Sequence, residues 1–167
     1  MLKPEFIIAD PYNPNHIDLY KRFEQENNLP NNASSYLETT KDHYEQEIYK
    51  ENIKNTNEIS ILGFLLSEEK IMDTCAIKIE KDRKIAHVTY SKQESKRRKI
   101  IPLSINYIFN VLEIEEVFVS VNKEDNILIN DLEYNSFESL GIGIDNNLQF
   151  IKEKEYEIIN ERKGQCK

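Results

Sequence analysis

A helix-like segment lies between two strand-like ones, and this order constrains the fold more than any other feature of the sequence. Ile85–Tyr90 and Glu116–Val121 are rich in β-branched and aromatic residues, which favour strands. Between them, apolar residues recur at the spacing of a helix face: Leu103, Tyr107, Ile108 and Val111. A helical crossover joins strands that run in the same direction, so the sequence predicts a parallel pair.

The remaining segments predict further strands and helices on both sides of this unit. The predicted strands are Phe6–Ala9, Ile59–Leu66, Cys75–Ile79 and the closing segments at Phe137 and Phe150–Tyr156, and the predicted helices begin at Asn13-Pro14, at Ser35 and near Ile127. Strands that meander and then cross over predict an α+β fold, with one mixed β-sheet flanked by helices on both faces. We expect a single domain over residues 1–167.

Composition excludes several classes of function. The chain has 167 residues and a formal net charge of −8, which repels DNA and anionic membranes. The apolar run Phe6–Ala9 is too short for a signal peptide or a membrane span. Cys75 and Cys166 stand far apart without a metal-binding spacing, so we expect reduced thiols, no metal and a cytoplasmic protein. From the negative charge and the short apolar run we expect no nucleic-acid or membrane partner.

A run of four bases, Lys96–Lys99, stands out in this acidic chain. It lies between the strand Ile85–Tyr90 and the helix that follows, where free N–H groups and the helix dipole favour anions. Three interpretations are open: a solvated loop, a nucleic-acid contact and a phosphate site. The rest of the chain offers no second basic run, which argues against a nucleic-acid contact. The position between a strand and a helix start favours a phosphate-bearing small molecule.

Two segments resemble the GNAT superfamily of acyl-CoA-dependent N-acyltransferases. In that family, the turn after the fourth strand carries a Q/R-x-x-G-x-G/A pattern whose N–H groups cradle the coenzyme A pyrophosphate, and Gln93–Arg98 occupies that place. Near the C-terminus, Val119–Asn122 and Leu132–Gly141 look like the strand, the helix and the "LEKLGFE" ending of the family. The resemblance covers nearly the whole chain and implies a GNAT-like fold with acetyl-CoA as cosubstrate.

The resemblance also implies which residues contact the coenzyme. Lys96 and Arg98 replace both glycines of the turn, so their side-chain charge would compensate for the lost backbone freedom. Pro102 is tolerated only in the first turn of a helix, so the helix must start close to Lys99. The coenzyme contacts implied are the backbone of Val88 and Tyr90, the turn residues Gln93, Lys96, Arg97, Arg98 and Lys99, and Asn126 on the later helix.

Catalysis in this family is direct attack of a neutral amine on the thioester, with a base on the amine and often a tyrosine protonating the thiolate. His87 and Tyr90 lie on the fourth strand with opposite orientations, and histidine is a residue type suited to general-base work near neutrality, so His87 is the candidate base. The tyrosine acid usually falls where Leu132 stands, so Tyr134, two residues later, is the candidate acid. A packed histidine without a catalytic role is the competing interpretation of His87.

Two functions follow from the resemblance. The first is an N-acyltransferase that transfers acetyl from acetyl-CoA to a primary amine, with the acceptor site built by residues Leu29 to Ser35, Tyr36 and Tyr44. The second is a catalytically impaired GNAT-like domain that acts as a binding or regulatory module. The absent glycines and the displaced tyrosine favour the second function, whereas the complete set of predicted elements fits both.

Overall fold

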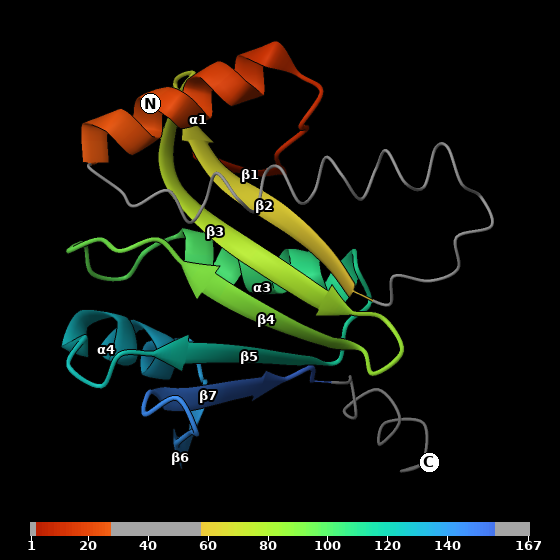
Figure 1. Cartoon of the computed structure of the whole chain (residues 1–167), viewed down its shortest axis with the longest axis vertical. Helices are drawn as coiled ribbons and strands as arrows, with labels where there is room; N and C mark the ends of the chain where they lie inside the picture. The colour runs from red at the N-terminus through yellow and green to blue at the C-terminus, as the bar shows by residue number, and fades with distance from the viewer. Residues whose placement is uncertain (1–2, 28–57, 156–167) are drawn as a thin grey trace, which may run out of the picture.

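The structure, a computed structural model, describes residues 3–27 and 58–155 of the chain, and these residues form one seven-stranded sheet with three helices (Figure 1). The strands are β1 (Glu5–Ile8), β2 (Glu58–Ser67), β3 (Lys70–Glu80), β4 (Ile85–Tyr90), β5 (Glu116–Val121), β6 (Glu138–Ile142) and β7 (Leu148–Glu153). The helices are α1 (Pro14–Asn27), α3 (Ile100–Asn110) and α4 (Asn126–Tyr134). The helix expected at Ser35 falls outside the described residues.

The sheet is mixed, as the sequence predicts. Its strand order is β1-β2-β3-β4-β5-β7-β6, and β4 pairs with β5 in parallel while each other neighbouring pair is antiparallel. The predicted crossover is confirmed, because α3 connects β4 to β5. Each end of the sheet is formed by a hairpin or a short strand, and the parallel pair lies near its middle.

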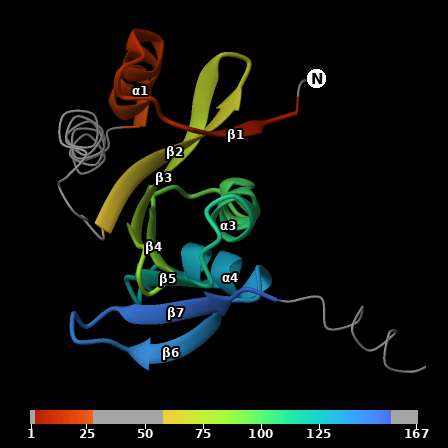
Figure 2. The ribbon, with the colours of Figure 1, turned by 90° about the vertical axis from the view of Figure 1, so that its right-hand side faces the viewer.

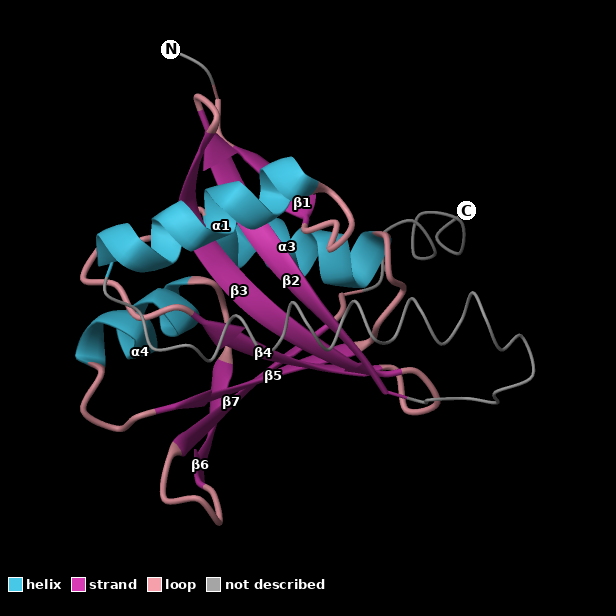
Figure 3. Cartoon of the chain, turned by 45° about the horizontal axis from the view of Figure 1, so that its top comes forward, coloured by secondary structure: helices cyan, strands magenta, loops and turns pink. Residues whose placement is uncertain are grey.

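Helices cover both faces, which confirms the predicted α+β architecture. In Figure 2, α1 lies on one side of the sheet, and α3 and α4 lie on the other. Figure 3 shows α1 crossing in front of β2 and β3. The α1 face has its own buried cluster, made of Ala9, Leu19, Tyr20, Phe23, Leu62, Phe64, Ile71 and Ala76.

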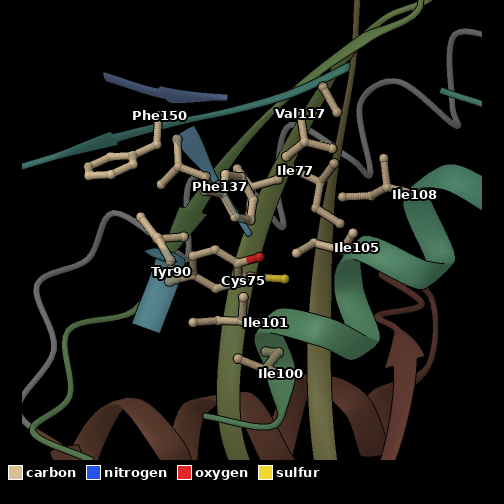
Figure 4. Packing of buried hydrophobic residues seen from close by; sticks show 14 of the residues in the cluster. Cys75, Ile77, Tyr90, Ile100, Ile101, Ile105, Ile108, Val117, Phe137 and Phe150 are labelled. Atoms are coloured by element: carbon tan, nitrogen blue, oxygen red, sulfur yellow. The ribbon is translucent and has the colours of Figure 1, made fainter. Parts of the chain in front are cut away.

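The larger core lies between the sheet and α3 with α4. Helix α3 contributes Ile100, Ile101, Ile105 and Ile108, an apolar stripe at helical spacing that points toward the strands in Figure 4. The helix is confirmed, but its predicted face is only partly right: Ile108 is buried, Leu103 and Tyr107 are partly buried, and Val111 is 61% exposed. Alternation along β4 places Ala86, Val88 and Tyr90 on this face. Leu132 and Phe137 close the core beneath α4.

The helix starts agree with their sequence signals. At α1 the Asn13 side chain accepts a hydrogen bond of 2.9 Å from the Asn15 N–H group, and Pro14 is the first helical residue. At α3 the N-cap is Lys99, so Pro102 falls in the first turn, where a missing N–H group costs nothing. In the described part of the chain, no helix is long and apolar enough to span a bilayer.

The turn between β2 and β3 is tight and strained. Glu68 and Glu69 form its two central residues and have φ angles of 53° and 62°, although neither is a residue that favours a left-handed backbone. Two positive φ angles in a two-residue hairpin loop are the geometry that Asn-Gly satisfies. The turn therefore stores strain that a substitution can remove.

We expect Glu68→Asn combined with Glu69→Gly to stabilise the protein by about 1 kcal/mol, because Asn-Gly adopts this turn without steric cost. Urea unfolding followed by circular dichroism measures the change. Glu68→Gln with Glu69→Gln removes the same two charges without changing backbone preference, so it is the matched control. An equal gain in the control would mean that charge, and not backbone strain, limits stability here.

Candidate functional site

The parallel strands β4 and β5 separate along their length. Their pairing covers Ile85, Ala86 and His87 on β4, and it ends at His87 opposite Phe118. Beyond this point both strands continue, to Tyr90 and Val121, and Figure 1 shows their arrowheads diverging. The sheet therefore opens between two adjacent strands at their carboxyl ends.

Backbone groups of β4 point into this opening. The Ser91 N–H group bonds to the Thr74 carbonyl on β3 at 3.1 Å, which fixes the alternation of the strand. Since successive backbone groups point to opposite edges, Val88 and Tyr90 direct theirs toward β5. Val88 thus lies where the strands part and Tyr90 lies beyond, which are the two residues predicted to offer backbone contacts.

The turn after β4 is held by a buried ion pair. The guanidinium of Arg98 donates to both carboxylate oxygens of Asp73 on β3, at 2.8 Å and 2.6 Å. The side chains of Arg98 and Asp73 are only 3% and 5% exposed. Ser91 donates to the same carboxylate at 2.8 Å. The sequence predicted phosphate as the partner of the Arg98 side chain, but the structure gives it an internal carboxylate.

Tyr90 belongs to the same buried network. Its hydroxyl lies 2.8 Å from the Ser104 hydroxyl on α3, and its ring centroid lies 5.7 Å from the guanidinium carbon of Arg98. Burial is the main reason why the pKa of Tyr90 is raised above its ordinary value. The phenol therefore stays protonated and links β4 to the first turns of α3.

A second buried carboxylate caps the turn from the other side. Asp131 of α4 is 3% exposed, and its two oxygens accept from the N–H groups of Arg97 at 2.6 Å and Arg98 at 3.4 Å. These N–H groups belong to the segment where the sequence predicts pyrophosphate binding. Asp131 provides the negative charge that the start of α3 favours.

Arg97 carries the backbone strain that the missing glycines led us to expect. Its φ angle is 54°, whereas Lys96 and Arg98, which stand at the glycine positions, are not among the residues with positive φ. The Arg97 side chain turns outward, and its guanidinium carbon lies 4.3 Å from the centroid of the Tyr134 ring. The candidate acid Tyr134 is thus brought to the turn.

The other predicted coenzyme residues lie at the surface. Lys96 and Lys99 are exposed on either side of the two arginines. The side-chain amide of Gln93 donates to the Met72 carbonyl at 3.2 Å, which ties the turn to β3. Asn126 is exposed at the first residue of α4, while Asp131 and Tyr134, which contact the turn, come from its later part.

His87 lies on the opposite face of the sheet from α3 and α4. Its Nε2 atom is 2.9 Å from a Glu80 carboxylate oxygen, and its ring stacks on Phe118 with centroids 5.6 Å apart. The His87 side chain is 51% exposed. The structure therefore places the candidate base His87 and the candidate acid Tyr134 on opposite faces.

Replacing His87 with alanine should raise the pKa of Glu80 toward its ordinary value. The hydrogen bond from His87 is the largest cause of the lowered pKa of Glu80, and the charge of Arg83 is a smaller one. An NMR titration of the Glu80 carboxyl carbon measures the change. Arg83→Ala is the control and should raise this pKa less; a larger rise in the control would mean that charge and not the hydrogen bond holds Glu80 ionised.

A cleft of about 480 Å³ opens on the α3 side of the molecule, next to Tyr134. Its lysines are committed to helix ends: Lys152 donates to the Asn135 carbonyl and Lys154 to the Phe109 carbonyl, both at 3.0 Å. The cleft is lined by Pro102, Ile105, Asn106, Phe109, Asn110, Tyr134, Asn135, Ser136, Lys152, Glu153, Lys154 and Glu155. Within residues 3–27 and 58–155, no cluster of side chains has the composition of a metal site.

The sequence predictions missed the two carboxylates that organise the turn. Asp73 interrupts the strongly apolar strand β3, and Asp131 stands beside Leu132 in the apolar pattern of α4. A charged residue inside an apolar pattern is the signal that could have identified both, because such a residue is buried only when it is paired.

No family model and no curated protein matches the sequence. Solved structures do match its fold. The N-acetyltransferase PseH of Campylobacter jejuni, solved in complex with acetyl coenzyme A, aligns with a TM-score of 0.58 at 12% identity, over 92% of this chain and 100% of that one. Mutant forms of the spermidine/spermine N-acetyltransferase SpeG of Vibrio cholerae align with a TM-score of 0.61 at 12% identity, over 90% and 95%.

These alignments run over nearly the full length of both chains, so they concern the whole sheet with its helices. The identities are too low to carry over the activity of either protein. The chain has the fold of the GNAT superfamily of N-acyltransferases.

Proposed function

We propose that this protein is an acyl-CoA-dependent N-acyltransferase that transfers an acetyl group to a primary amine. The observation that carries the proposal is the opening between β4 and β5 beyond His87 and Phe118. A pantetheine arm can lie in such an opening and accept or donate the backbone hydrogen bonds that β4 and β5 do not make to each other there. The turn from Gln93 to Arg98 stands at its end, where the nucleotide part of the donor would emerge.

Backbone groups of β4 suit the thioester carbonyl. An N–H group of Tyr90 that points toward β5 can donate to the carbonyl oxygen, where negative charge develops during attack. The amine nitrogen forms a bond to the carbonyl carbon, the carbon–sulfur bond breaks, and the amine loses a proton. In this proposal His87 accepts that proton and Tyr134 supplies one to the thiolate, from opposite faces of the sheet.

The face that carries His87 suits a cationic acceptor. On β5, Ser120 lies beyond the last paired residue and donates to Asp145 at 3.0 Å. A backbone hydrogen bond from Asn147, followed by the Ser120 hydroxyl, lowers the pKa of Asp145, so its carboxylate stays ionised. SpeG is described as a spermidine/spermine N-acetyltransferase, so spermidine is the first amine to test. A cytoplasmic location, where thiols remain reduced, belongs to the same proposal.

The second candidate is a GNAT-like module without efficient catalysis. The observation that favours it is the hydrogen bonding of Asp131 to the N–H groups of Arg97 and Arg98, the segment that would otherwise receive a diphosphate. A module of this kind would keep the sheet and the core while losing tight coenzyme binding. The two candidates therefore differ in donor binding and in turnover.

Thermal unfolding with and without acetyl-CoA tests the proposal. A ligand that binds only the folded state at one hundred times its dissociation constant stabilises that state by about 2.7 kcal/mol. We expect a rise in the unfolding temperature, together with release of free thiol when spermidine is added. No rise at millimolar acetyl-CoA and no thiol release with a panel of primary amines would favour the second candidate.

A further inference from the structure

The carboxylate of Asp131 stands where an acyl-CoA diphosphate would be expected to bind. It is buried, it belongs to the chain itself, and it accepts from two successive N–H groups just ahead of α3. The bond from Arg97, at 2.6 Å, is short and charge-assisted, like those of a bound phosphate, and the bond from Arg98 is longer, at 3.4 Å. The start of α3 is therefore already neutralised from within the fold.

We propose that Asp131 is a specificity-determining residue that makes donor binding depend on the acyl-pantetheine arm and not on the diphosphate. The inference rests on the proposed function, since it concerns the donor of that reaction. The donor class is a pantetheine thioester, and its nucleotide part contributes little to affinity.

Asp131 cannot swing aside easily. The neighbouring residue Leu132 is completely buried in the core, and the Asp131 carbonyl accepts from the Asn135 N–H group at 3.1 Å. The burial of Leu132 holds this part of α4 in the core, and the Asn135 hydrogen bond keeps the helix backbone regular at Asp131. A diphosphate would have to displace a carboxylate that is fixed in place, or approach it as a like charge in surroundings that screen poorly.

The basic run does not restore a strong phosphate site. Arg98 is paired with Asp73 in the interior, and Arg97 lies over Tyr134. Of the four bases, Lys96 and Lys99 extend into solvent, where salt screens their attraction for a phosphate. The run that looks strongly cationic in the sequence therefore offers a phosphate three exposed cations, Lys96, Arg97 and Lys99, beside one buried carboxylate that already occupies the N–H groups.

The hydrogen bonds of Asp131 do not involve the residues that are expected to bind the pantetheine arm. Val88 and Tyr90 direct backbone groups toward the opening between β4 and β5, on the strand that precedes the turn. An amide-containing arm can bond to these groups as an added strand segment. In this protein the pantetheine arm of a coenzyme A thioester therefore meets backbone groups that can bond to it, whereas the diphosphate meets a buried carboxylate.

Calorimetric titration of the wild-type protein with acetyl-CoA and with S-acetylpantetheine tests the inference without any substitution. We expect dissociation constants that agree within about threefold. A preference for acetyl-CoA of a hundredfold or more would overturn the inference, because the diphosphate would then supply much of the affinity.

The variant Asp131→Asn keeps the side-chain size and removes the charge. We expect it to bind acetyl-CoA at least about tenfold more tightly while its affinity for S-acetylpantetheine stays the same. Glu133→Gln removes one charge from an exposed position of the same helix and should leave both affinities unchanged. Equal changes in the two variants, or no gain in Asp131→Asn, would contradict the specific role of Asp131.

Inorganic pyrophosphate separates this inference from the proposed function. If neither thioester binds either protein, the proposed function fails. Binding of pyrophosphate to Asp131→Asn but not to the wild type would still support the exclusion of diphosphate by Asp131. Equal pyrophosphate binding by both proteins would overturn that exclusion.

Discussion

Replacing Arg98 with alanine should lower the free energy of unfolding by about 3–5 kcal/mol, the typical cost of removing one partner from a buried ion pair. The substitution leaves the Asp73 carboxylate buried, with Ser91 and the Thr74 N–H group as its remaining donors. It also removes one of the connections between β3 and the turn that precedes α3, and the bond from Gln93 to Met72 remains. Most of the loss comes from leaving the Asp73 carboxylate buried without its partner, and not from the lost attraction between Arg98 and Asp73.

Denaturant unfolding measures this loss, and Lys96→Ala is the matched control. Lys96 is exposed in the same basic run, so its removal should change stability by less than about 0.5 kcal/mol. The double variant Arg98→Met with Asp73→Leu should regain most of the stability, because no charge is left unpaired. Similar small effects of Arg98→Ala and Lys96→Ala would mean that Arg98 is not buried against Asp73 in solution.

Replacing Ile101 with alanine should cost about 2–5 kcal/mol of stability, in the range found for large cavities in protein cores. Ile101 is fully buried in the first turn of α3, where Figure 4 shows it beside Ile100 in the core cluster. The loss combines the transfer of the removed carbon atoms with the cavity that they leave.

A graded series makes this prediction specific. Ile101→Val should cost about 0.5–1.5 kcal/mol, and Val111→Ala, at a residue that is 61% exposed just after the same helix, should cost less than about 0.5 kcal/mol. Urea unfolding of the three variants measures the series. Equal costs for Ile101→Ala and Val111→Ala would mean that the first turn of α3 does not pack on the sheet as described.

Most of the described fold could be predicted because its signals are local. Alternation along Ile85–Tyr90, helical spacing through α3 and the Asn13-Pro14 helix start each act within a few residues. The parallel pair followed from the crossover between its strands. The helix predicted to begin at Ser35 and the acceptor residues near Tyr36 and Tyr44 lie outside the described residues.

The site was predicted less well because its decisive contacts are long-range. The position of the basic run between a strand and a helix could be predicted, and so could the start of that helix near Lys99. Its charges find partners far away in the chain: Asp73 is 25 residues from Arg98, and Asp131 is 34 residues from Arg97. Local patterns identify the cations of the run, whereas tertiary folding decides which of them remain available to a ligand.

Amide NMR spectra recorded during a titration with acetyl-CoA test most directly whether a donor binds in the opening between β4 and β5. We expect the largest shifts at the amides of Val88 and Tyr90, which point toward β5, with smaller shifts at Thr89, Arg97 and Arg98. Amides of β1, at the far edge of the sheet, should not move. Shifts confined to other surfaces, or none at millimolar acetyl-CoA, would contradict a donor site between these strands.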